Sequence, residues 1–191
     1  MSEQGRLESV YLKPGDDVGR WVQDLLDLEA AGWKGKRGTS LKSAAPVAAA
    51  FAEAARELHE AGKLRFWSLT FDGRAIATMF AIVEGNGAWL GKIAYDEAFA
   101  KFSPGVLLIL DATEGLFNEG RFDLVDSCAI PNHPMIDNIW RDRVAAADVL
   151  VASADTGQSR FEFTAGAERL RRAARSTARG IFHTLTRRHR S

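Results

Sequence analysis

The spacing of hydrophobic residues switches between helical and strand-like periods along the chain. In residues 18–28 the apolar positions recur every three or four residues, which predicts a helix that follows two acidic residues and ends near Gly32. A second helix is predicted to open near Ser43, with a proline tolerated in its first turn, and to end at Gly62. Residues 7–12 are compatible with a short strand before the first helix.

Three strand-like runs follow the second predicted helix, at residues 64–71, 74–84 and 88–95. They are separated by Asp72-Gly73 and by a Gly-Asn-Gly sequence at 85–87, both of which favour tight hairpins. The middle run is apolar on both faces, which is typical of a central strand. The sequence therefore predicts an antiparallel meander.

The period then returns to that of a helix. Ser103 is a plausible N-cap for a helix over residues 104–119, which has proline at its first position and Gly120 as its stop. This helix is apolar on nearly all sides, so we expect it to be buried. Residues 122–128 resemble another strand, and strand 88–95, the helix and this strand form one crossover. We therefore predict an α+β fold with a mixed sheet, in which these two strands are parallel.

Further elements are predicted in the last third of the chain. A short helix is expected around residues 134–142, a last strand at 144–152 and a basic helix from about 164 to 183. We expect a globular domain over residues 1–160 and a basic C-terminal helix or tail over residues 161–191.

The composition and the net charge indicate what class of protein this is. Hydrophobic residues make up 46% of the 191 residues and the formal net charge is zero, so we expect a globular protein that does not bind nucleic acid. The charge is uneven, because nine arginines lie from Arg160 onward and leave the preceding residues acidic overall. This basic segment could be a solvated helix or could dock on an anionic surface. The sequence has no apolar run long enough to cross a membrane and no leader, so a cytoplasmic location is expected.

The N-terminus of the predicted crossover helix is a candidate anion site. Unpaired backbone N–H groups and the helix dipole attract anions at such a terminus. Here Lys101 adds a cation, Ser103 adds a hydroxyl, and Gly105 allows close approach to the backbone, within the run Lys101-Phe102-Ser103-Pro104-Gly105. An ordinary helix start with a solvated lysine is the alternative.

Residues 126–137 contain the densest set of polar and titratable groups, and they follow the predicted parallel strand. His133 could act as a general acid or base, or it could cap the short helix. Asp126 could share in proton transfer, or it could accept a backbone hydrogen bond. Cys128, the single cysteine, is more typical of a small hydrophobic residue than of a nucleophile. The four histidines share no ligand spacing, so no metal is expected.

Residues Trp33–Thr39 are cationic and rich in glycine, which predicts a loop between the first two helices. A tryptophan in such a loop needs a surface to pack on. The loop could close over an anionic ligand, or it could be a solvated connection.

Four segments in register resemble the CelD/BcsL-like acyltransferases of the GNAT (acyl-CoA N-acyltransferase) superfamily. They are LEAAGWKGKRGTSL, LRFWSLTFDGRAIATMF, KIAYDEAFAKFSPGVLLILD and VDSCAIPNHPMIDNIW. The resemblance spans residues 25–152 and corresponds to the C-terminal half of proteins that carry two such halves. It implies a transferase that uses acetyl-CoA or another acyl-CoA, with a role in cellulose or exopolysaccharide production.

The resemblance also implies a site. Strand 88–95 would splay from its parallel neighbour and offer backbone groups to the pantetheine arm, and the Lys101–Gly105 turn would hold the pyrophosphate. A backbone N–H near Ile93 or Ala94 is our candidate oxyanion donor.

For the chemistry at that site, we expect His133 or Asp126 to move the proton. Trp33, Lys34 and Asp137 are our candidates for binding a small-molecule or saccharide acceptor. A second GNAT-like half or a second copy of the chain is a possible partner. The alternative hypothesis is a non-catalytic GNAT-like half that serves as a binding or interaction module.

Overall fold

The computed structural model describes residues 5–147 and 149–188. The chain divides into two compact units, Met1–Arg143 and Val144–Ser191, whereas the sequence suggested a boundary at residue 160. The first unit contains β1 (Leu7–Tyr11), α1 (Val18–Ala31), α2 (Trp33–Lys36), η1 (Leu41–Ser43), α3 (Ala45–Glu60), β2 (Leu64–Phe71), β3 (Arg74–Glu84), β4 (Gly87–Tyr95), η2 (Glu97–Phe102), α4 (Pro104–Asn118), β5 (Leu124–Asp126) and α5 (Ile136–Ile139). The second contains α6 (Gln158–Arg188).

The five strands of the first unit form one sheet in the order β1-β2-β3-β4-β5. The first four strands pair antiparallel, while β4 and β5 pair parallel across the α4 crossover, as the sequence predicted. β3 is buried on both faces over most of its length, which confirms it as a central strand. The fold is therefore the predicted mixed sheet with helices.

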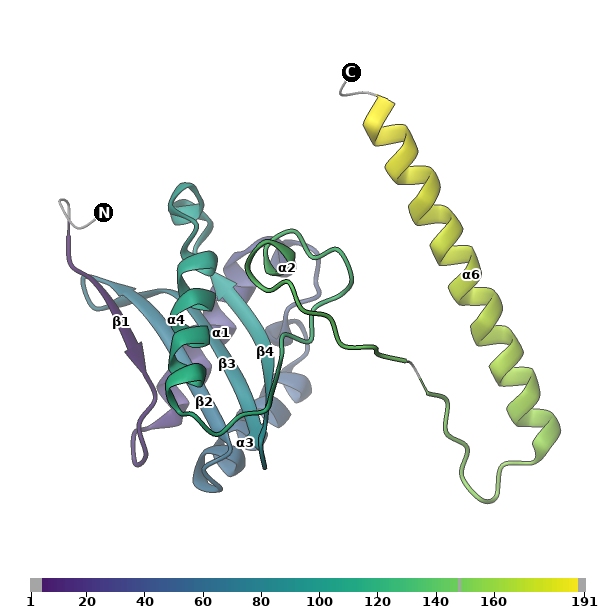
Figure 1. The fold of residues 1–191 in the computed structure, drawn as a ribbon, viewed down its shortest axis with the longest axis horizontal. Helices are drawn as coiled ribbons and strands as arrows, with labels where there is room; N and C mark the ends of the chain where they lie inside the picture. The colour runs from purple at the N-terminus through teal and green to yellow at the C-terminus, as the bar shows by residue number, and fades with distance from the viewer. Residues whose placement is uncertain (1–4, 148, 189–191) are drawn as a thin grey trace. The chain divides into compact units, whose positions relative to one another are not determined.

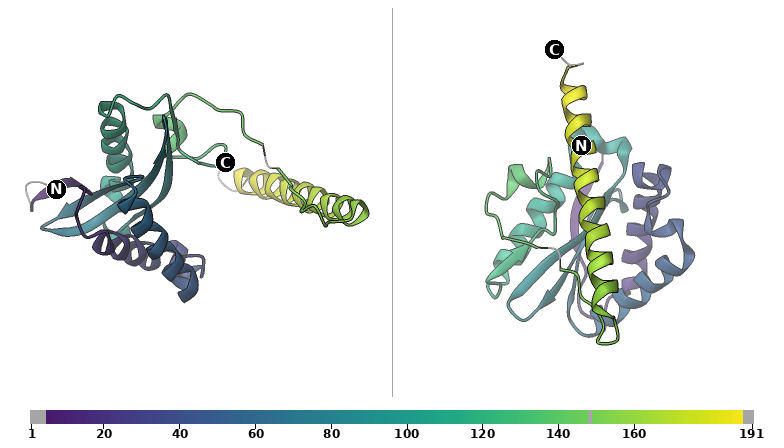
Figure 2. Two further views of the ribbon diagram at one scale, coloured as in Figure 1. Left: turned by 90° about the horizontal axis from the view of Figure 1, so that it is seen from below. Right: turned by 90° about the vertical axis from the view of Figure 1, so that its right-hand side faces the viewer.

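Helices cover both faces of this sheet (Figures 1 and 2). α1 and α3 pack on one face around Leu25, Phe66 and Phe80. α4 packs on the other face through Leu108, Ile109, Ala112 and Leu116. Burial of these apolar side chains is the main stabilising contribution to the unit.

Helix α4 is less buried than its composition suggested. Leu107, Leu110 and Phe117 are exposed, with Phe117 exposed over 83% of its surface. The opposite side of the helix packs on the sheet. A helix that is apolar on nearly all sides is therefore only half-buried here. Ser103 occupies the N-cap position, but its side chain makes no capping hydrogen bond and its backbone is left-handed, with φ of 52°.

Three other predictions need correction. Residues Trp33–Lys36 form the short helix α2 rather than a loop. The strand predicted at 122–128 is shorter, since β5 is Leu124–Asp126. The strand predicted at 144–152 does not form, and its described residues are irregular, because the backbone N–H and C=O groups of this segment have no neighbouring strand of the described chain to pair with.

The second unit consists of the extended segment from Val144 and the single helix α6. The predicted basic helix is therefore present and longer than expected. Within α6, Glu168 pairs with Arg171 and Arg172 one turn along the helix. None of the described helices in the chain is both long and apolar enough to cross a membrane.

Candidate functional site

The parallel strands β4 and β5 separate soon after they meet. They pair only from Gly87 opposite Leu124 to Trp89 opposite Asp126, after which β4 continues to Tyr95. Beyond Trp89, the outer edge of β4 therefore has no strand of the described residues beside it. Backbone N–H and C=O groups along such an edge can bind an extended ligand.

The same part of β4 contains a bulge. Met79 of β3 lies opposite Ile93, but Ala81 lies opposite Leu90, so Gly91 and Lys92 share one position on the partner strand. A Cβ atom on Gly91 would lie 2.2 Å from the ring of Phe80, so only glycine fits here without movement of that ring. The bulge redirects the backbone of β4 at the point where the sheet opens.

The turn between β4 and α4 brings a backbone donor to this opening. The N–H of Ser103 donates to Ala100 O, and those of Val106 and Leu107 donate to Ser103 O. The N–H of Gly105 donates to no described residue, although Gly105 is buried. A buried N–H without an acceptor at a helix N-terminus is suited to an anion, so this turn fits a phosphate group.

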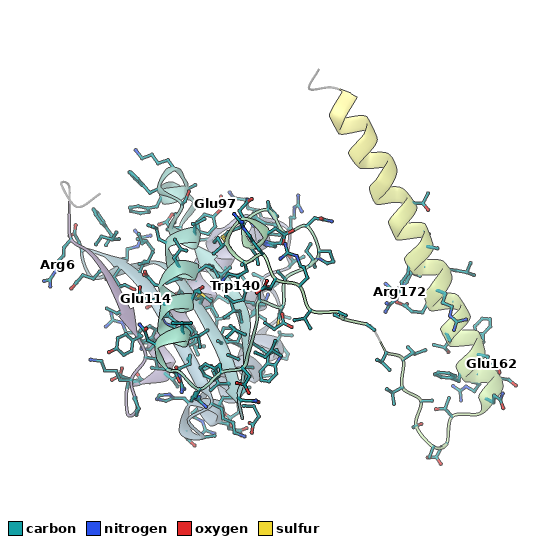
Figure 3. The ribbon with its side chains drawn as sticks, viewed as in Figure 1. Arg6, Glu97, Glu114, Trp140, Glu162 and Arg172 are labelled. Atoms are coloured by element: carbon teal, nitrogen blue, oxygen red, sulfur yellow. The ribbon has the colours of Figure 1, made fainter. Side chains whose placement is uncertain are left out.

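Side chains also pack around Gly105 in the present structure. A Cβ atom on Gly105 would lie 3.5 Å from the Tyr95 ring, 3.6 Å from Met135 Sδ and 3.7 Å from Ile93 Cδ1. The chain after β5 thus folds back onto the opening between β4 and α4. It is fastened there by Trp140, whose Nε1 donates to Thr113 Oγ1 at 3.0 Å (Figure 3).

On the other side of β4 lies a hollow of about 40 Å³. It is lined by Leu28, Glu29, Gly32, Trp33, Ile93, Ala94, Tyr95 and Glu97. The structure therefore brings the predicted residues Trp33, Ile93 and Ala94 to one place. The lining of the hollow combines aromatic and carboxylate side chains, which is typical of sites for cationic or polyhydroxylated ligands.

Glu97 fixes the position of α2 beside this hollow (Figure 3). Its Oε1 accepts the Trp33 N–H at 2.7 Å and its Oε2 pairs with Lys36 Nζ at 2.8 Å. The hydrogen bond from Lys36, followed by that from the Trp33 amide, lowers the pKa of the Glu97 carboxyl. The carboxylate therefore joins α2 to the turn that leads into α4.

Glu29 is the most deeply buried carboxylate of the site, with a side chain 1% exposed. Its Oε1 pairs with Lys92 Nζ at 2.8 Å and its Oε2 accepts the Leu41 N–H at 2.8 Å. The sequence analysis missed this pair. Glu29 lies four residues after Leu25 on the apolar face of α1, and a charged residue at that position was the available signal.

The polar segment after β5 has local roles in the structure. His133 Nδ1 accepts the N–H groups of Met135 and Ile136 at 3.4 and 3.3 Å, as a cap of α5 would. Asp126 Oδ1 accepts the Cys128 N–H at 2.8 Å. The part of each side chain in proton transfer stays a prediction, and neither residue lines the hollow beside α1.

Other predicted residues are dispersed around the site. Asp137 pairs with Arg143 at 3.2 Å, and Lys101 lies over the ring of Phe102 at 4.7 Å from its centroid. The side chain of Lys34 lies outside the described residues. Burial, then the charge of Asp126, raises the pKa of the Cys128 thiol, which makes it a weaker nucleophile at neutral pH. No group of three metal-ligating side chains occurs in the part of the chain that the structure describes.

Comparison with known proteins gives a family and a fold. The model of the acetyltransferase (GNAT) domain family matches residues 3–132. No curated protein matches the chain.

Similar solved structures have low sequence identity. One is a possible acetyltransferase from Clostridium difficile 630, with a TM-score of 0.54, 12% identity and coverage of 77% of this chain and 99% of that one. Another is an aminoglycoside acetyltransferase from an uncultured soil metagenomic sample in complex with sisomicin, with a TM-score of 0.53, 16% identity and coverage of 79% and 97%. A third is the aminoglycoside N-acetyltransferase AAC(6')-Iy in complex with CoA, with a TM-score of 0.51, 15% identity and coverage of 80% and 97%.

Proposed function

Since the chain belongs to the acetyltransferase (GNAT) domain family, we propose that it transfers an acyl group from an acyl-CoA to a small-molecule or saccharide acceptor. The attacking group of the acceptor is an amine or a hydroxyl. The solved relatives named for CoA and for sisomicin support this choice of donor and of acceptor class.

The observation that carries the proposal is the early separation of β4 from β5. Only three residue pairs join the strands, while β4 runs on beside the N-terminus of α4. An extended pantetheine arm would bind along this free edge, and its pyrophosphate would face the N–H of Gly105 and the cation of Lys101. Phe102, Ser103 and Pro104 complete the turn that presents this donor.

The reaction itself joins the acceptor nitrogen or oxygen to the thioester carbonyl carbon and breaks the carbon–sulfur bond. The acyl-CoA supplies the activated carbonyl and the thiolate leaving group. A backbone N–H of Ile93 or Ala94 stabilises the oxyanion. His133 and Asp126 stay the candidates for taking the acceptor proton or returning a proton to the thiolate, and an acceptor that reaches them must extend beyond the hollow beside α1.

One polar group of the acceptor would bind in the hollow of about 40 Å³ between α1, α2 and the C-terminal part of β4, with the rest of the acceptor outside it. Trp33 offers a ring that is 52% exposed, and Glu29 and Glu97 add carboxylates to the lining. Lys34 and Asp137 stay candidates for acceptor binding that rest on the sequence alone. Glu29 and Glu97 are already paired with Lys92 and Lys36, so the exposed ring of Trp33 is the feature that favours an acceptor with an ammonium group or a sugar face.

A narrower role in cellulose or exopolysaccharide production rests on the resemblance to the CelD/BcsL-like acyltransferases. In that setting a second GNAT-like half, or a second copy of the chain, would complete the acceptor site. Mass measurement of complexes formed with and without a saccharide acceptor would test this role.

A thermal titration with acetyl-CoA tests the proposed donor. At 100 times its dissociation constant, the ligand adds about 2.7 kcal/mol to the free energy of unfolding. The variants Lys101→Gln and Gly105→Pro are expected to weaken this effect, whereas Lys42→Gln, outside the turn, is the matched charge control. Absence of any shift would instead favour a non-catalytic module.

A second experiment separates binding from chemistry. The variants His133→Ala and Asp126→Asn are expected to lower the rate of acyl transfer while acetyl-CoA still stabilises the protein. Release of CoA thiol, followed against a panel of amines and sugars, measures the rate. Unchanged rates in both variants would remove these two residues from the mechanism.

A further inference from the structure

A second and larger cleft lies at the end of the sheet where β1 ends and β2 begins, between the last turns of α4 and the end of α3. Its volume is about 450 Å³, and Tyr11, Trp67, Gly115 and Glu119 contribute to its walls. The cleft exists because α4 packs mainly on β2, β3 and β4 and leaves the end of β1 without a helix over it (Figure 1). Clefts of this size accommodate small organic ligands.

Trp67 forms the floor of the cleft and has an unused hydrogen-bond donor. The residue is 7% exposed, and its Nε1–H donates to no described residue. No enclosed side-chain donor or acceptor of the described residues lacks a partner, so this N–H must reach the open cleft. A Cβ atom on Gly115 would lie 3.1 Å from Nε1, so the missing side chain leaves room at this donor. A buried indole N–H normally finds an acceptor.

One of the positively charged side chains around the cleft has no carboxylate of the described residues paired with it. Arg65 is neutralised by Glu119, with Nε and Nη2 at 2.8 and 3.1 Å from the carboxylate oxygens. Lys13, in contrast, forms no ion pair with any described residue, and its Nζ lies 5.7 Å from the centroid of the Tyr11 ring. Tyr11 is directly opposite Trp67 in the sheet, so the cation and the indole donor belong to the same wall.

We propose that this cleft binds a small aromatic carboxylate. The ring of the ligand would pack between Tyr11, which is 61% exposed, and the floor formed by Trp67. Its carboxylate would accept the Trp67 Nε1–H and pair with Lys13. An uncharged aromatic molecule would not pair with the ammonium of Lys13. A small aliphatic acid would leave the rings of Tyr11 and Trp67 exposed to water. The cleft is separate from the acyl-transfer site and requires no acyl-CoA.

Titration of the full chain with 2-naphthoate tests the proposal. We expect saturable binding by calorimetry and a shift of one tryptophan indole N–H signal in NMR spectra, identified by its loss in Trp67→Phe. Lys13→Gln is expected to weaken binding about three- to tenfold, as the loss of one partly exposed ion pair would. Lys42→Gln, which removes a lysine outside the cleft, should bind like the wild type.

Two matched compounds sharpen the test. 2-Naphthalenemethanol retains the ring without the charge and should bind at least threefold more weakly than 2-naphthoate, whereas acetate should not shift the indole signal. Because Lys13 is exposed, its variant should fold even if Trp67→Phe does not. The proposal is overturned if 2-naphthoate does not bind, if the uncharged compound binds equally well, or if Lys13→Gln binds with unchanged affinity.

Discussion

Replacement of Lys92 by methionine should destabilise the protein, because it removes the ammonium that pairs with the buried Glu29 carboxylate. Removing one partner of a buried pair costs about 3–5 kcal/mol. Lys92 is 36% exposed, so water already screens part of the interaction. We therefore expect Lys92→Met to lower the free energy of unfolding by about 2–3 kcal/mol, which is less than the loss for a fully buried pair.

Urea unfolding followed by circular dichroism measures this change. The double variant Lys92→Met/Glu29→Gln removes both charges and retains an oxygen for the Leu41 N–H, so it should recover at least half of the lost stability. Lys101→Met, which removes an exposed lysine, should change stability by less than about 0.5 kcal/mol. A loss below about 0.5 kcal/mol in Lys92→Met, or no recovery in the double variant, would refute the reasoning.

Three further outcomes are expected. The pKa of Glu97 is lowered in the folded protein, so its contribution to the free energy of unfolding is complete above the unfolded carboxyl pKa of about 4.3 and is lost as the pH falls through the folded pKa. The fluorescence of Trp33 should change in that acid range. The variant Glu97→Gln should not show this change. Ser103→Gly should raise stability by about 1 kcal/mol in thermal unfolding, because glycine adopts a φ of 52° without strain; a loss would show that the serine side chain matters more. Acetyl-CoA should increase hydrogen exchange in residues 133–140, which compete for the same opening; unchanged exchange at saturation would contradict this.

Much of the first unit could be predicted from the chain because its signals are local. The meander over β2, β3 and β4 is specified by two glycine-containing turns, and the α4 crossover fixes the parallel direction of β5. These features need no knowledge of distant contacts. The predicted mixed sheet is confirmed for that reason.

The errors concern elements whose state depends on partners far along the chain. Residues 144–152 have a strand-like composition, but no strand of the described chain pairs with them. α2 is held by Glu97, a residue 64 positions after Trp33, which no local pattern reveals. The Glu29–Lys92 pair likewise joins α1 to a bulge in β4. The roles proposed for His133, Asp126 and the Lys101–Gly105 turn stay predictions.

The double attachment of Glu97 has a consequence for how the two proposed substrates would affect each other's binding. Its carboxylate belongs to the connection that enters α4, yet it holds the amide of Trp33 and the ammonium of Lys36. In the proposed function, movement of either wall would strain the other, so acyl-CoA binding would change the affinity for the acceptor, and by linkage the acceptor would change the affinity for acyl-CoA.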